Sequence, residues 1–135
     1  MSAHLYIIRG VPGAGKTTLA KQIARSHFEA CFFYAADDWF DIHNGGIFDA
    51  SRLGEAHSWC LNSVKAGLQK NRPVFVHNTF TTEKELKPYI DFCNENNIPF
   101  TCIVVENRHG NKSVHNVPEE KVNQMRERLR GSIKL

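Results

Sequence analysis

Hydrophobic residues along this chain fall into short apolar runs separated by longer segments of mixed polarity. The runs predict strands at residues 5–8, 31–35, 74–76 and 100–105. Apolar positions recur at helical spacing over residues 18–25, 51–69 and 82–96, which predicts three amphipathic helices. A fourth helix is expected over residues 118–130, because Pro118 and Glu119 suit a first helical turn. The polar segments 36–50 and 106–117 are predicted to be loops.

Strands and helices are thus predicted to alternate four times with short links between them. This order is typical of an α/β fold, with a small parallel sheet of about four strands and helices on both faces. The 135 residues suffice for one domain, which we expect to span residues 1–135. Ligands of such folds bind beyond the carboxyl ends of the strands. The segments that follow the strands are therefore expected to form one site.

Composition and charge exclude few classes of protein. Charged residues make up 23% of the chain and hydrophobic residues 41%, as in ordinary globular proteins. The net charge of +3 does not indicate nucleic-acid binding by itself, although it is compatible with a phosphate-rich substrate. Four cysteines, none in a C-x-x-C pair, are expected to be reduced core residues of a cytoplasmic protein. No signal peptide or membrane span is recognised, so no membrane partner is expected.

The segment after the first predicted strand contains the most specific motif. Residues 10–17 read G-V-P-G-A-G-K-T and match the phosphate-binding loop, G-x-x-x-x-G-K-[ST]. The motif lies between a predicted strand and a predicted helix, as it requires, and its early position suggests that the first strand is central. Lys16 would reach the β- and γ-phosphates of ATP, and the Thr17 hydroxyl would ligate Mg²⁺. The predicted nucleotide contacts are Gly10, Pro12, Gly13, Ala14, Gly15, Lys16, Thr17 and Thr18.

Two neighbouring carboxylates, Asp37 and Asp38, follow the second predicted strand. A phosphoryl-transfer enzyme needs a carboxylate that accepts the proton of the attacking hydroxyl. We predict that Asp37 takes this role and that Asp38 lies near the Mg²⁺. The alternative is a structural role, in which the pair caps a helix or turn with Asp38 as the N-cap.

The third predicted strand is followed by His77, Asn78 and Thr79. His77 occupies the position where an Asp normally holds Mg²⁺ in enzymes with this loop. A neutral imidazole suits Mg²⁺ poorly because this ion prefers oxygen ligands. The metal would then rely on Thr17, the phosphates and an Asp of the preceding pair. Asn78 and Thr79 either orient the loop or the substrate, or belong to a side-chain network that braces the strand end.

The loop at residues 106–117 is a candidate lid. In nucleotide-handling kinases such a loop closes over the site and brings positive charge to the transferring phosphoryl group. Lys112 and Arg108 are the catalytic candidates here. The alternative is a solvated basic loop without such a role.

Taken in order, these motifs resemble a known family. They are residues 9–18 (R-G-V-P-G-A-G-K-T-T), 37–40 (D-D-W-F), 56–57 (A-H), 78–80 (N-T-F) and 115–118 (H-N-V-P). Together they resemble the P-loop kinase-like ATP-binding proteins, the group of AAA_33 domains and zeta-toxin-like kinases that is related to bacteriophage 5′-hydroxyl polynucleotide kinases. The resemblance implies a three-layer, kinase-type P-loop NTPase fold, ATP binding, and Asp37 as the base for a 5′-hydroxyl.

The chain departs from that family at three positions. Phe40 replaces an Arg that helps to hold substrate, His77 replaces an Asp, and Lys112 stands near the place of the lid Arg. Lys lacks the bidentate fork of Arg. Besides a simple ATPase activity, for which no water-positioning residue can be singled out, two functions therefore remain open. One is an ATP-dependent kinase that acts on a polynucleotide or nucleotide 5′-hydroxyl; the other is a catalytically weak ATP-binding regulatory or partner-binding module.

Overall fold

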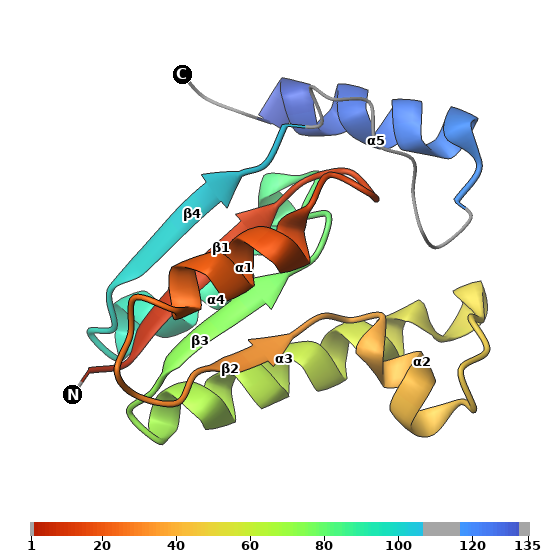
Figure 1. The fold of residues 1–135 in the computed structure, drawn as a ribbon. Coiled ribbons are helices and arrows are strands. Elements are labelled where there is room, and N and C mark those ends of the chain that lie inside the picture. Colours follow the sequence, from red (N-terminus) through yellow and green to blue (C-terminus); the bar gives the residue numbers. More distant parts are fainter. Residues whose placement is uncertain (1, 107–116, 133–135) are drawn as a thin grey trace.

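The computed structural model describes residues 2–106 and 117–132 (Figure 1). Within these residues four parallel strands form one sheet in the order β2-β3-β1-β4. The predicted α/β fold class is therefore confirmed. In chain order the elements are β1 (His4–Arg9), α1 (Lys16–Ala24), β2 (Phe32–Tyr34), α2 (Asp38–His43), the 3₁₀ helix η1 (Ala50–Arg52), α3 (Leu53–Gln69), β3 (Pro73–His77), α4 (Glu83–Glu95), β4 (Phe100–Val104) and α5 (Glu119–Ser132).

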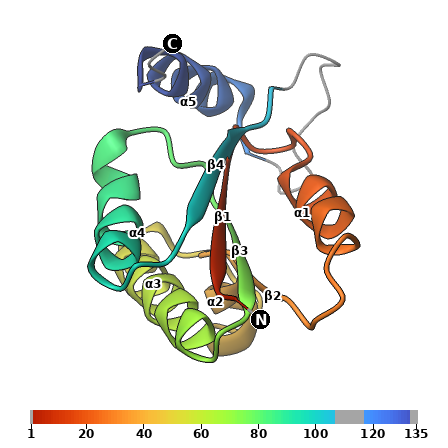
Figure 2. The same ribbon diagram turned by 90° about the vertical axis from the view of Figure 1, so that its left-hand side faces the viewer.

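Helices cover both faces of this sheet. Figure 2 shows α1 on one face and α3 with α4 on the other, while α5 lies near the carboxyl end of β1 and β4. Strand β1 lies between β3 and β4 and is central, as predicted. Its residues Leu5, Ile7 and Ile8 are fully buried. Because the central strands are apolar on both faces, helices must cover both, and three layers result.

The larger part of the core lies between the sheet and helices α3 and α4. Helix α3 presents Ala56, Cys60, Val64 and Leu68 at a spacing of four residues, and all four are buried. This spacing places them on one helix face. They pack in one cluster with residues of β1, β3 and α4.

On the opposite face, aromatic rings run across three strands. Tyr6 stacks on Phe75 with the ring centroids 4.5 Å apart, and Phe33 stacks on Phe75 at 5.2 Å. Both pairs are direct neighbours in the strand registers. Cross-strand aromatic pairs stabilise the register in which they form. They therefore help to keep the carboxyl ends of β1, β2 and β3 at one edge.

Two sequence predictions differ from the structure. Residues 36–50 are not one loop, because α2 and η1 form within them. Trp39 and Phe40 of α2 are buried, and a helix this short shows no periodic pattern in the sequence. The cysteines are not all core residues: Cys102 is exposed and Cys31 is half-buried. Both lie at or next to an edge strand, which a neighbouring strand protects on one side only.

The membrane prediction can be compared with the helices that the structure describes. Among residues 2–106 and 117–132, no helix combines the length and the apolar character needed to cross a membrane.

Helix α3 contains two glycines that provide a test of this packing. A Cβ atom at Gly67 would lie 3.0 Å from Val74 Cγ2 and 3.2 Å from Phe32 Cδ2, whereas a Cβ at Gly54 would meet nothing within 4 Å. We expect Gly67→Val to lower the free energy of unfolding by about 1–3 kcal/mol through overpacking. Gly54→Val is the matched control and should be neutral or slightly stabilising, because Val favours a helix more than Gly does. Urea unfolding measures both, and equal losses would contradict the close contact of α3 with the sheet.

Candidate active site

Hydrogen bonds join the segments that follow the four strands. The Gly10 N–H donates to the Thr79 carbonyl at 3.2 Å, and the Val105 N–H donates to the Arg9 carbonyl at 2.7 Å. The Ala36 N–H donates to Asn78 Oδ1 at 2.8 Å. The ends of all four strands therefore meet at one edge of the sheet, where the sequence placed the candidate site.

The phosphate-binding loop has the backbone geometry that its glycines allow. A Cβ atom at Gly10 would lie 2.9 Å from the Val105 carbonyl oxygen, so only glycine permits this close approach to the end of β4. Gly15 has a φ of 97°, in the left-handed region, and directly precedes α1. The sequence motif therefore corresponds to a loop that turns from β1 into a helix N-terminus.

The underside of this loop packs on α5. Val11 and Ala14 are buried against Val122, and the partly buried Met125 joins the same cluster. Of the remaining predicted nucleotide contacts, Gly10 is buried, Pro12, Gly13 and Lys16 are half-buried, and Gly15, Thr17 and Thr18 are exposed. The loop is thus anchored on one side and accessible on the other.

Lys16 is the first residue of α1 and its ammonium folds onto the loop backbone. Its Nζ donates to the Gly10 carbonyl at 2.9 Å and to the Val11 carbonyl at 3.0 Å. Burial lowers the pKa of Lys16 to about 8, and the negative charge of Asp37 partly offsets this effect. The loop therefore contains a cation whose charge has little compensation from the protein.

The two carboxylates after β2 have different surroundings. Asp37 is exposed, and its charge acts on both Lys16 and His77. Asp38 is half-buried, and its Oδ2 accepts the Ala35 N–H at 3.2 Å. Asp38 is the first residue of α2, and the N-cap position is Asp37, without a side-chain cap hydrogen bond. The expected N-cap position of Asp38 is therefore wrong, but its bond to the Ala35 N–H agrees with the structural alternative, in which the pair caps a turn.

Asn78 connects the end of β3 to the segment that bears Asp37. It is buried, its Oδ1 accepts the Ala36 N–H, and its Nδ2 donates to Cys60 Sγ at 3.7 Å. The bracing network that the sequence left as one alternative is thus present. Because Ala36 directly precedes Asp37, Asn78 helps to position that carboxylate.

Arg9 is a buried residue at this edge to which sequence reasoning assigned no role. Its Nε donates to the Phe80 carbonyl at 2.9 Å, and its Nη2 donates to Ser132 Oγ at 2.6 Å. Phe80 is buried and has a φ of 47°, which is unusual for a bulky side chain. The signal in the sequence was a charged residue at the end of an apolar strand, directly before the loop.

His77, the last residue of β3, lies beside the loop. Its Nδ1 is 3.5 Å from Thr17 Oγ1. Burial and the positive charges of Lys16 and Lys21 lower the pKa of His77 to about 4. The imidazole is therefore neutral at physiological pH, and it stands where a carboxylate was expected.

The described residues can be tested for a fit to a divalent cation. Among them, no group of three or more His, Cys, Asp or Glu side chains converges on a point. Thr17 offers an exposed hydroxyl at the start of α1. Mg²⁺ typically retains several waters and is bound through few protein ligands plus substrate phosphates. The residues therefore fit a cation that arrives with a nucleotide rather than one held by the protein alone.

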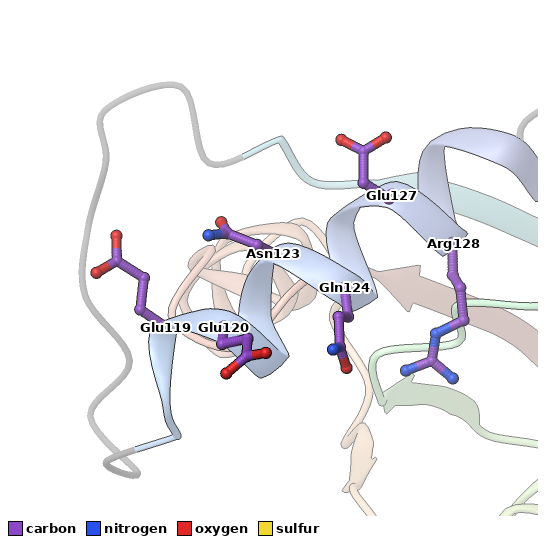
Figure 3. A pocket seen from close by; sticks show the side chains of 6 residues that line it. All are labelled: Glu119, Glu120, Asn123, Gln124, Glu127 and Arg128. Carbon is purple, nitrogen blue, oxygen red and sulfur yellow. The ribbon is translucent and has the colours of Figure 1, made fainter.

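Two predicted residues lie outside the described part of the chain. Arg108 and Lys112 belong to residues 107–116, so their catalytic roles stay predictions, as does most of the proposed lid. A large open groove on α5 does not replace the predicted site. Figure 3 shows the residues that line it: Glu119, Glu120, Asn123, Gln124, Glu127 and Arg128. The three glutamates among them would repel phosphate.

Comparisons with known proteins agree with this geometry. NEDD4-binding protein 2 of Homo sapiens is 30% identical over 131 residues, covering 91% of this chain and 7% of the relative, so the chain spans a small part of that protein. The solved Pnkp1/Rnl/Hen1 RNA repair complex gives a TM-score of 0.77 at 18% identity, covering 97% of this chain and 45% of the other. The structure of the APS kinase CysC of Mycobacterium tuberculosis in complex with AMPPNP and APS gives a TM-score of 0.63 at 12% identity. This match covers 91% of this chain and 68% of the other.

Both structural likenesses are below 25% identity and show the fold: a parallel sheet with helices, as in P-loop kinases. Family membership rests on a match over nearly the whole chain. Residues 5–131 match the AAA_33 family, described as an AAA domain. The chain therefore belongs to the AAA_33 family of P-loop kinase-like domains.

Proposed function

We propose that this chain binds ATP with Mg²⁺ and transfers the γ-phosphoryl group to a hydroxyl, such as the 5′-hydroxyl of a polynucleotide or nucleotide. The observation that supports this most is that Lys16 and Asp37 both follow strands at one edge of the sheet, where the charge of Asp37 raises the pKa of Lys16 and so opposes the effect of burial. Phosphoryl transfer requires both a cationic phosphate site and a carboxylate near the acceptor. The likeness to an RNA repair complex supports a nucleic-acid acceptor.

The donor side of the site would consist of the loop and its neighbours. The backbone N–H groups of residues 15–18, at the N-terminus of α1, would bind the phosphates, and Lys16 would exchange its bonds to the Gly10 and Val11 carbonyls for phosphate oxygens. Thr17 and Asp38 would hold the Mg²⁺. When bound, this ion neutralises charge on the β- and γ-phosphate oxygens.

The acceptor side would centre on Asp37. The acceptor hydroxyl oxygen forms a bond to the γ-phosphorus while the bond from that phosphorus to the bridging oxygen breaks, and ADP leaves. The hydroxyl proton passes to the Asp37 carboxylate. Lys112 or Arg108 would stabilise the charge on the transferring group.

One observation favours the alternative of a catalytically weak ATP-binding regulatory module. Phe40, at the position of a substrate-holding Arg in the family that the sequence resembles, is 3% exposed. Its ring packs against Trp39 at 5.1 Å and Phe48 at 5.1 Å. Phe40 is thus part of the core and makes no polar contact with an acceptor. A module of this kind would bind a partner in a nucleotide-dependent way without turnover.

Incubation of labelled ATP and Mg²⁺ with 5′-hydroxyl oligonucleotides, and separately with mononucleosides, tests the proposal. We expect label on an acceptor hydroxyl. Asp37→Asn should lower the transfer rate by about 10²–10⁴-fold because it removes the base, while nucleotide binding is retained. Lys16→Ala should weaken nucleotide binding itself. Wild-type protein that binds Mg²⁺-ATP but labels no acceptor would contradict the kinase and favour the regulatory module.

The pKa of Lys16 predicts how ATP affinity depends on pH. The ammonium must be protonated to pair with phosphate, and its pKa in the free protein is about 8. Above that pH, binding requires proton uptake, so affinity should fall by up to about tenfold per pH unit. Calorimetry in buffers of different ionisation enthalpy measures the uptake. Lys16→Arg stays protonated and should remove the dependence; a flat wild-type profile through pH 9.5 would contradict the assignment.

Asn78 provides a test of how Asp37 is positioned. In Asn78→Ala the buried Ala36 N–H loses its partner, which should cost about 1–3 kcal/mol of stability. Because Ala36 adjoins Asp37 and not the loop, kcat should fall while nucleotide affinity stays close to that of the wild type. Asn96→Ala, at the exposed end of α4, is the matched control, and we expect it to change neither kcat nor nucleotide affinity. Equal kcat values in the two variants would refute the positioning role.

A further inference from the structure

The end of β3 places an imidazole beside the hydroxyl that is the expected cation ligand. His77 Nδ1 lies 3.5 Å from Thr17 Oγ1, at the long limit of a hydrogen bond. His77 pairs with Ile8 of β1 in the sheet register, two residues before the loop begins. The two side chains are therefore held side by side by the central strands and by the start of α1.

The separation of these two atoms suits neighbouring ligands of one metal ion. In an octahedral complex with bonds of about 2.1 Å, adjacent ligand atoms lie about 3 Å apart. The observed 3.5 Å is close to this value, so a small side-chain rotation would let Nδ1 and Oγ1 share one cation. Thr17 is exposed, so such an ion can reach it.

The chemistry of the two atoms differs from that of a Thr and Asp pair. Mg²⁺ prefers oxygen ligands, whereas imidazole nitrogen suits later transition metals, and affinity for such sites rises from Mn²⁺ to Co²⁺ and Ni²⁺. The charges that face the ring are those of Lys16, Lys21 and Asp37. Two of these three are positive, so a cation would enter only together with the nucleotide phosphates.

We propose that His77 determines which divalent cation accompanies the nucleotide, by offering a nitrogen ligand next to Thr17 that favours Co²⁺ and Mn²⁺ over Mg²⁺. This inference rests on the proposed binding of a nucleotide, and it does not depend on which acceptor is phosphorylated. It assigns a specific consequence to one of the three departures of this chain from the family pattern.

Binding of the β,γ-methylene analogue of ATP, measured by calorimetry at pH 7.5 with Mg²⁺, Mn²⁺ or Co²⁺, tests the selectivity. The wild type should bind the analogue more tightly with Co²⁺ than with Mg²⁺. His77→Asp and His77→Gln should each reduce the ratio of the two affinities by about tenfold or more, as loss of a metal-site partner usually does. His57→Gln, on exposed α3 surface, is the control and should keep the wild-type ratio.

Pulsed electron paramagnetic resonance of the Mn²⁺ complex gives a readout that needs no activity. The wild type and His57→Gln should show coupling of Mn²⁺ to an imidazole nitrogen, and His77→Gln should lack it. Tight binding of the analogue with neither this coupling nor a preference for Co²⁺ would overturn the inference alone. A wild type that binds the analogue with none of the cations would overturn the proposed function and this inference with it.

Discussion

The close approach of the β1 carboxyl end to β3 and β4 is the constraint on which the rest of this site depends. The Gly10 N–H bonds to Thr79, and the Arg9 carbonyl accepts the Val105 N–H. A side chain at residue 10 would collide with the Val105 carbonyl, so the approach requires glycine. Because β1 is central and buried, the loop that leaves it has no freedom to move away from its neighbours. The phosphate site is therefore a property of the sheet as much as of the loop.

Arg9 extends this constraint to the last helix. Its guanidinium is buried and joins the Phe80 carbonyl to Ser132 at the end of α5. Burial of a charge is costly unless hydrogen bonds compensate for it. The two contacts of Arg9 therefore hold Phe80 and Ser132 in place next to the end of β1. At the other end of α5, Val122 packs beneath the loop. The helix is thus held at two places by residues 9–14, which explains why it lies near the carboxyl end of the sheet.

The sequence predicted the parallel sheet, the central first strand and the edge at which the chemistry gathers, because buried strands and the loop motif leave strong local signals. The sequence did not predict α2, because this helix has only six residues and lies in a polar stretch. Its buried residues Trp39 and Phe40 attach it to the core. The sequence did not decide whether Asn78 orients the substrate or braces the strand end, because the hydrogen-bond partner of Asn78, Ala36, lies 42 residues away along the chain. Exposure of Cys102 depends on strand order, which an apolar run does not reveal.

The two sides of the site differ in how they are built. The proposed donor side consists of backbone amides and of Lys16, which stand at the junction of β1 and α1. The proposed acceptor side depends on side chains after β2, where Asp37 is exposed and Phe40 is part of the core. A core residue cannot return to the surface without opening a cavity, which typically costs several kcal/mol. In the proposed reaction, acceptor recognition would therefore need residues other than the one at position 40.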